Sequence, residues 1–248
     1  MMKKIVLYTL LIYSCCSCQA GDEFSLVTWQ SKHLIDYYID VEDVMLELYS
    51  QMSSKPYIVI RFRGGDIYPS PELYDEVMKW DYLSDCPIYY GNEAFVAKFN
   101  ELASQNGDKG FLRKNSYWVL GEDAKTGKLL TFDNIFIRCN KAIVQSISDV
   151  KITSDADFDD EHPAGSSLEN ITSVDIMSYA LMLRSGKNDN PRCLKPFAEL
   201  SAEELKIIGD YLAFSFMRKP SLSKVHNLTV MLTLDDGKVF TNTIKMEF

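Results

Sequence analysis

Short runs of β-branched and aromatic residues, separated by polar turns, fill the second half of the chain and constrain its fold more than any other feature. Such runs are typical of strands that pair in sheets. The clearest two, residues 225–234 and 238–245, flank Asp235-Asp236-Gly237. Because its glycine can adopt the positive φ of a tight turn, this segment predicts an antiparallel hairpin. Further strands are expected at residues 117–120, 129–139, 143–153 and 174–183.

The first half mixes both kinds of pattern. Strands are expected at residues 25–30, 33–39 and 56–62, the last ended by Gly64-Gly65-Asp66. Helices are expected after three capping residues: Asp40, before apolar positions that run to Met52; Ser70, before Pro71 and a helix to about Trp80; and Asn92, before a helix closed by Gly107. A capping box of Ser201 and Glu204 predicts one later helix, residues 202–211.

Together these elements predict an α+β fold. A mixed region, residues 18–127, would precede a mainly antiparallel, immunoglobulin-like β-sandwich, residues 128–248. The boundary is expected near residues 124–127. The alternative is one fused domain over residues 24–248.

The first 17 residues have the layout of a secretory signal. Lys3 and Lys4 precede the apolar run 5–13, and small and thiol residues follow. A spanning helix needs about 20 apolar residues, so this run is too short to anchor the chain by itself.

The segment resembles a bacterial lipoprotein signal, in which the cysteine after the cleavage site is acylated with chains such as palmitate. Cys18 follows three small residues and is the expected lipid attachment site, with Cys15 as the alternative. The short tract 19–23, with Asp22 and Glu23, is similar to the acidic tract of surface-exported lipoproteins in Bacteroidetes. Several acyl chains, each contributing about 0.8 kcal/mol per buried methylene, would hold the protein firmly on a membrane.

Charge excludes nucleic acid as a partner. Without residues 1–17, Lys and Arg fall from 26 to 24 against 35 Asp and Glu, which gives a formal charge of −11. This charge would repel nucleic acid and an anionic membrane surface alike, so attachment is expected from the lipid. No cofactor is expected.

Three further cysteines, Cys86, Cys139 and Cys193, are too far apart in sequence for a clustered metal motif. In an oxidising compartment a bridge between Cys139 and Cys193 is plausible, but spacing does not decide the pairing.

The densest polar cluster runs from Asp155 to His162 and includes four aspartates and Glu161. Alternating aspartates suit a calcium loop, but the sixth position is Asp160 instead of glycine and the twelfth is Ser166 instead of glutamate. A solvated loop is the favoured interpretation, and calcium binding stays open.

No catalytic motif stands out. The sequence has no His-Glu-x-x-His, and its three histidines, His33, His162 and His226, lie far apart. A site built on Cys86 is disfavoured, because a lone cysteine is usually a core residue. The aromatic stretch from Tyr68 to Tyr90, with Tyr74, Trp80, Tyr82 and Tyr89, is either core packing, which is favoured, or a stacking platform.

Residues 146–171 and 219–248 resemble segments of a Bacteroidetes-type lipoprotein family with a domain of unknown function. The resemblance implies an envelope location and transfers no catalytic residue. We therefore expect a lipid-anchored outer-membrane protein, exposed at the cell surface or alternatively on the periplasmic face. Non-enzymatic binding of a glycan or protein is favoured. The alternatives are a hydrolase whose site joins distant residues and a structural component of the outer membrane.

Overall fold

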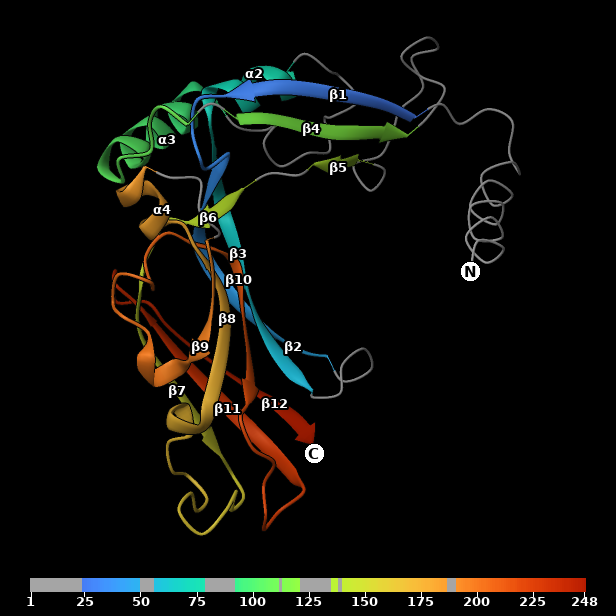
Figure 1. Cartoon of the computed structure of the whole chain (residues 1–248), viewed down its shortest axis with the longest axis vertical. Helices are drawn as coiled ribbons and strands as arrows, with labels where there is room; N and C mark the ends of the chain where they lie inside the picture. Colours follow the sequence, from blue (N-terminus) through green and yellow to red (C-terminus); the bar gives the residue numbers. More distant parts are fainter. Residues whose placement is uncertain are drawn as a thin grey trace, which may run out of the picture.

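The computed structural model describes residues 24–49, 56–78, 92–111, 113–120, 135–137, 140–186 and 191–248, and strands predominate in it (Figure 1). The strands are β1 (Phe24–Ser31), β2 (Tyr37–Tyr49), β3 (Tyr57–Pro69), β4 (Arg113–Leu120), β5 (Ile135–Ile137), β6 (Lys141–Ile143), β7 (Ile147–Ser154), β8 (Thr172–Ser178), β9 (Arg192–Pro196), β10 (Ile208–Phe216), β11 (Val225–Leu234) and β12 (Val239–Glu247). The helices are α2 (Pro71–Met78), α3 (Glu93–Gln105) and α4 (Ala180–Ser185), with 3-10 turns η4 (Glu169–Ile171) and η5 (Phe197–Glu199).

These strands form three sheets. The largest has the order β6-β2-β3-β10-β8-β9 and is antiparallel except where β6 runs parallel to β2. A second sheet, β12-β11-β7, packs against it, and a third, β1-β4-β5, lies across the top of the molecule in Figure 1. The α+β class with an antiparallel β-sandwich part is thus confirmed.

The main hydrophobic core lies between the six-stranded sheet and the sheet β12-β11-β7. Strand β11 shows the underlying pattern, because His226, Leu228, Val230, Leu232 and Leu234 are buried in strict alternation. Successive side chains of a strand point to opposite faces, so one face of β11 is apolar and faces the core.

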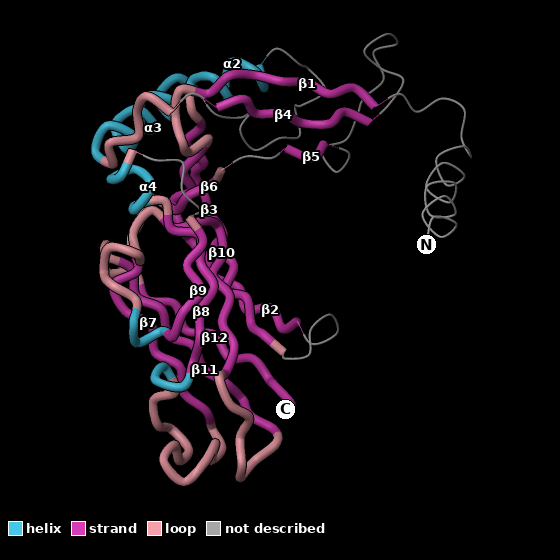
Figure 2. The backbone as a smooth tube through the Cα atoms, in the orientation of Figure 1, coloured by secondary structure: helices cyan, strands magenta, loops and turns pink. Residues whose placement is uncertain are grey.

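A second core lies at the upper end of this sandwich, beneath α3 (Figure 2). Phe99, Leu102 and Ala103 of the helix pack there with Tyr38 of β2 and Met182 of α4. Asn92 caps the helix as predicted: its Oδ1 accepts hydrogen bonds from the amides of Ala94 and Phe95. Ser70 likewise accepts one from Leu73 at the start of α2.

The last hairpin is confirmed, with Gly237 at φ +87°. Other expected strands are shorter or divided. The strand expected at residues 143–153 is divided between the end of β6 and β7. The strand expected at residues 174–183 ends with β8 at Ser178, and α4 begins at Ala180. Of the strand expected at residues 33–39, residues 33–36 precede β2.

The helix expected after Asp40 is wrong up to Tyr49, because these residues belong to β2, and residues 50–52 lie outside the described part of the chain. Their apolar side chains fit helical spacing, yet Val44, Leu46 and Leu48 also alternate and pack on the main core. Pairing with β3 runs from Tyr37–Pro69 to Tyr49–Tyr57 and is interrupted only by register shifts between Ile39 and Asp43. A long-range partner therefore outweighs the local pattern.

The glycine pair does not end β3, which continues to Pro69. The register with β2 shifts there, since Val41 pairs with Gly64 and Ile39 with Ile67, which is a bulge. A Cβ on Gly64 would lie 2.3 Å from Ile39 Cγ2 and 2.7 Å from the Asp40 carbonyl oxygen. Glycine thus lets the two backbones approach.

The helix expected at residues 202–211 is also wrong, although its capping box forms. Glu204 N donates to Ser201 Oγ at 3.3 Å, and Ser201 N donates to Glu204 Oε2 at 2.9 Å. The turn then stops at Ile207, whose φ of +49° is not helical. β10 starts at the next residue and fills the centre of the large sheet.

Both expected regions contribute to the six-stranded sheet. β2 and β3 precede residue 127, whereas β6, β8, β9 and β10 follow it. The two sets of strands also share the main core. The division into domains itself stays a prediction.

Candidate functional site

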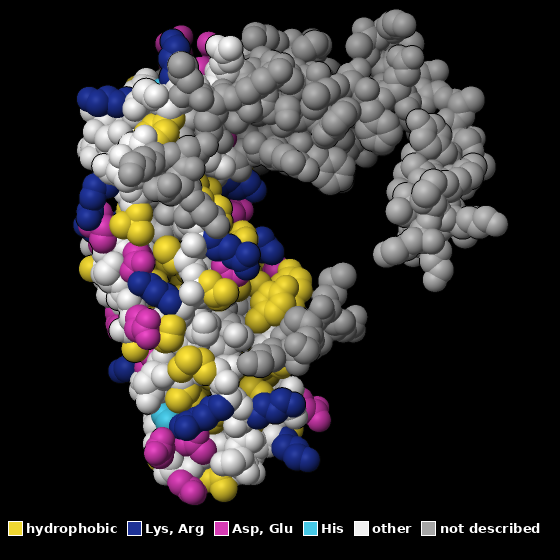
Figure 3. Space-filling view, viewed as in Figure 1, with side chains coloured by type: hydrophobic (Ala, Val, Ile, Leu, Met, Phe, Trp, Pro, Cys, Tyr) yellow, Lys and Arg dark blue, Asp and Glu magenta, His cyan; other side chains and the backbone are white. Residues whose placement is uncertain are grey.

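A groove of about 590 Å³ lies on the face of the six-stranded sheet that is turned away from the sandwich core. Five strands line it: β2, β3, β10, β8 and β9. In Figure 3, hydrophobic side chains adjoin basic and acidic ones over this part of the sheet. The lining residues are Tyr49, Tyr57, Val59, Arg61, Ser173, Val174, Asp175, Arg192, Leu194, Tyr211, Ala213, Phe214 and Ser215.

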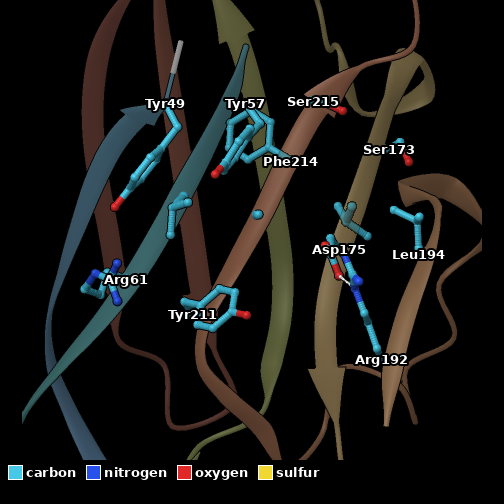
Figure 4. A pocket seen from close by; sticks show the side chains of 13 residues that line it. Tyr49, Tyr57, Arg61, Ser173, Asp175, Arg192, Leu194, Tyr211, Phe214 and Ser215 are labelled. Carbon is cyan, nitrogen blue, oxygen red and sulfur yellow. Dashed lines mark hydrogen bonds and ion pairs between the residues drawn. The ribbon is translucent and has the colours of Figure 1, made fainter. Parts of the chain in front are cut away.

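Strand register and residue size together make the hollow. Ala213 pairs with Val59 on one side and with Asp175 on the other, and Ser215 pairs with Ser173. These side chains are short, and Val59 and Ala213 are only 6% and 8% exposed, so they form the floor. Longer side chains of β3 and β9 form the two sides of the groove, and Tyr211 lies at one end (Figure 4).

Two tyrosines form one wall. Tyr49 and Tyr57 are cross-strand partners, and their rings stack at 5.2 Å between centroids with an angle of 5° between planes. Because β3 lies between β2 and β10, Tyr49 covers the β2 side of the Tyr57 ring. Tyr57 also lines the groove, and a rigid apolar ring face of this kind suits stacking.

Two guanidinium–carboxylate pairs complete the rim. Arg61 donates from Nε and Nη2 to Glu47, at 3.2 and 3.0 Å, and Arg192 donates from Nε to Asp175 at 2.7 Å and from Nη2 to its other oxygen at 2.5 Å. Both are two-bond contacts, the strong arrangement for this pair. The hydrogen bond from Arg61, with a second from the Tyr49 hydroxyl, lowers the pKa of Glu47, and the pairings raise the pKa of both arginines.

This arrangement is suited to binding. An aromatic face can pack against an apolar ring face, while hydroxyl, carboxylate and guanidinium groups around it exchange hydrogen bonds with a polar ligand. The described lining residues include no histidine or cysteine.

The carboxylates of the Asp155–His162 cluster hold the loop together through hydrogen bonds within the chain. Asp155 accepts two hydrogen bonds from Asn227, and Asp157 accepts one from the Ala164 amide. Their carboxylates are thus committed to the chain's own donors, which leaves the calcium hypothesis without support from the geometry.

Asp159, Glu161 and His162 place one potential metal ligand each within 4.8 Å of one another. Arg218 Nη2, however, lies 2.9 Å from Asp159 and 3.2 Å from Glu161. The guanidinium provides the positive charge that a bound cation would otherwise bring to these carboxylates. The cluster is thus an ion-pair network that ties this loop to the residues after β10.

The three histidines lie in three separate places. His33 Nδ1 is 3.3 Å from Glu72, and His162 Nδ1 is 2.6 Å from Asp159. His226 Nδ1 is 2.7 Å from Ser154 Oγ, a spacing that suits a nucleophile and base. His226 is fully buried, however, and Ser154 is 4% exposed, so the contact stabilises the core and is closed to a substrate.

Only part of the aromatic stretch is described. Tyr68 is buried, and burial, with the charge of Asp40 next, raises its pKa to about 12. Tyr74 is half-buried on α2. Trp80, Tyr82, Tyr89 and Tyr90 lie outside the described residues. The tyrosines of the groove are different ones, from β2, β3 and β10.

Sequence analysis did not identify the groove. Tyr57, Val59 and Arg61 alternate within an expected strand, which is a signal that they share a face. Nothing local indicates which face is outward or that β9 and β10 contribute to the same surface.

The expected attachment residues Cys18 and Cys15, like Cys86 and Cys139, lie outside the described residues. Cys193 is a half-buried thiol whose pKa is raised by burial and then by Glu204. Within the described part of the chain, no helix combines the length and apolar character needed to cross a membrane.

Comparison with models of protein families, with curated proteins and with solved structures finds no match of any of the three kinds.

Proposed function

We propose that the chain is a lipid-anchored protein of the cell envelope that binds a glycan, without catalysis, in the groove on the six-stranded sheet. The observation that carries the proposal is the Tyr57 ring, backed by Tyr49 and flanked by the pairs Arg61–Glu47 and Arg192–Asp175. A sugar ring presents an apolar face edged by hydroxyl groups, and this wall matches both parts.

The envelope location rests on the amino-terminal residues. Lys3, Lys4, the apolar run 5–13 and Cys18 support export and acylation, and the acidic tract 19–23 supports the outer face. A groove that binds sugars from outside the cell fits this location.

Binding without hydrolysis is favoured by the state of the groove's carboxylates. A glycosidase needs one carboxylic acid with a raised pKa to protonate the leaving group. The pKa of Glu47 is lowered by Arg61, and Asp175 holds Arg192 through both oxygens. Neither carboxylate is arranged as an acid.

Screening the purified chain, without residues 1–17, against an array of oligosaccharides tests the proposal. We expect binding of at least one glycan, and we expect Tyr57→Ala to weaken it about tenfold, the loss from removing about 1.4 kcal/mol of stacking. Leu222→Ala, which shortens an exposed side chain outside the groove, is the control and should bind like the wild type.

Two results contradict the proposal. One is an array with no bound glycan. The other is equal loss in Tyr57→Ala and Leu222→Ala, because the binding surface would then lie elsewhere. Cleavage of a bound oligosaccharide would favour the hydrolase alternative.

A further inference from the structure

The charged residues of the groove form pairs with one another. Arg61 pairs with Glu47, which borders the groove on β2, and Arg192 pairs with Asp175 across β8 and β9. The two positive and two negative charges cancel. A ligand therefore meets polar groups with no net charge.

The geometry of each pair matters as much as its charge. Arginine recognises a carboxylate through two parallel N–H donors on one edge of the guanidinium. In Arg61 the edge formed by Nε and Nη2 is already bound to Glu47, and in Arg192 the same edge is bound to Asp175. An acidic sugar would have to displace a protein carboxylate to use this edge. The other edge, Nη1–Nη2, shares Nη2 with the existing pair and belongs to a guanidinium whose charge is already balanced.

An uncharged sugar meets no such competition. Its hydroxyl groups can donate to the carboxylates of Glu47 and Asp175 and can accept from donors around the floor, with both ion pairs intact. The overall charge of the chain, −9, adds a general repulsion toward anions.

We propose, on the basis of the proposed glycan binding, that the groove selects a short uncharged oligosaccharide and discriminates against uronic and sialic acids. One sugar ring packs on Tyr57, and its neighbours extend over Ala213 and Ser173 toward Leu194. A volume of about 590 Å³ lies within the usual range of roughly 300–1,000 Å³ for sites that enclose small ligands.

The test uses an array that carries neutral oligosaccharides beside the same oligosaccharides bearing a uronic or sialic acid. Binders are then titrated by calorimetry in low and high sodium chloride. We expect binding of neutral glycans, weaker binding of their acidic counterparts, and a dissociation constant for the neutral ligand that changes little with salt, because screening acts on charged partners.

Asp175→Asn sharpens the test. The variant removes the negative charge that opposes Arg192 and weakens the pairing on its Nε–Nη2 edge, so affinity for the acidic counterpart should rise about tenfold, in line with a new charge-assisted contact. Asp149→Asn makes the same charge change at an exposed position of β7, outside the groove, and should leave both affinities unchanged. A thermal melt of each variant confirms folding.

The outcomes separate the two proposals. If wild type binds an acidic glycan as tightly as its neutral counterpart, or more tightly, the groove binds glycans but this inference is wrong. If no glycan binds, glycan binding itself is contradicted, and the selectivity falls with it.

Discussion

Tyr57 owes its place in the groove to its neighbours on both sides. The ring of Tyr49, on β2, stacks on the ring of Tyr57, and the short side chain of Ser215, on β10, lines the same groove. The contact expected with a sugar is between ring faces, so it depends on the ring and not on the hydroxyl.

Replacing Tyr57 with phenylalanine separates these two contributions. We expect Tyr57→Phe to keep the affinity for the bound glycan within about threefold of wild type, whereas Tyr57→Ala loses about tenfold. Titration calorimetry measures both. An equally large loss in both variants would mean that the hydroxyl, and not stacking, carries the contact.

Glu204 links a turn to a strand. Burial raises its pKa, but hydrogen bonds from Lys195 and Ser201 lower it by more, to about 2. A carboxylate with a depressed pKa stabilises the fold above its unfolded pKa, near 4.5, and this stability is lost as the pH falls through the folded value.

Glu204→Gln should therefore lower the free energy of unfolding by about 1 to 3 kcal/mol at pH 7, and its deficit should shrink between about pH 4.5 and 2. Urea denaturation over this pH range measures the difference. Glu199→Gln, at an exposed position of η5, is the control. A deficit that stays constant with pH would contradict the assignment.

Among the elements, the β2–β3 bulge requires a residue without a Cβ atom at position 64. Gly64 and Gly65 are adjacent, yet a Cβ on Gly64 would meet the backbone of Asp40, whereas one on Gly65 would meet only the flexible end of Glu42.

We expect Gly64→Ala to destabilise the protein by about 2 to 3 kcal/mol and Gly65→Ala by less than about 1 kcal/mol. Thermal and urea unfolding of the two variants checks this. Equal destabilisation would show that backbone freedom, and not close approach, explains the pair.

Elements set by nearby residues could be predicted from the sequence. Helix α3 needs only Asn92 and the apolar face with Phe99, and the last hairpin needs only its turn. The segment after Ser201 shows the limit of this reasoning, since its capping box forms while β10 follows it. That strand is stabilised by β3 and β8, which no local pattern reveals.

The groove was beyond such reasoning for the same reason. Its floor exists only because Ala213 lies between Val59 and Asp175. Three separated stretches must reach one register before the short side chains adjoin.

At the scale of the whole molecule, the proposed anchor precedes β1 closely. Phe24 is six positions after Cys18, and an extended chain of this length spans about 20 Å. With an acylated Cys18, the sheet β1-β4-β5 would lie near the membrane surface.

Labelling cells with a fatty-acid analogue tests the anchor. We expect labelled wild type, unlabelled Cys18→Ala, and normal labelling of Cys15→Ala, because cleavage directly before Cys18 removes Cys15 with the signal segment. Protease added to intact cells should digest the protein if it is exposed outside. The reverse labelling pattern would assign the lipid to Cys15.

The central place of β10 governs how the chain reaches its native state. Arg61 of β3 pairs with Tyr211 of β10, which lies far along the chain. The large sheet can therefore be completed only after most of the chain is available. Contacts so distant in sequence make folding slow, and until β10 arrives the apolar sides of β3 and β8 lack their common neighbour. A chain ending before residue 208 lacks the strand that joins the two halves of the sheet, so we expect it to aggregate. The full chain should likewise need protection from aggregation until about its last 40 residues are available to fold.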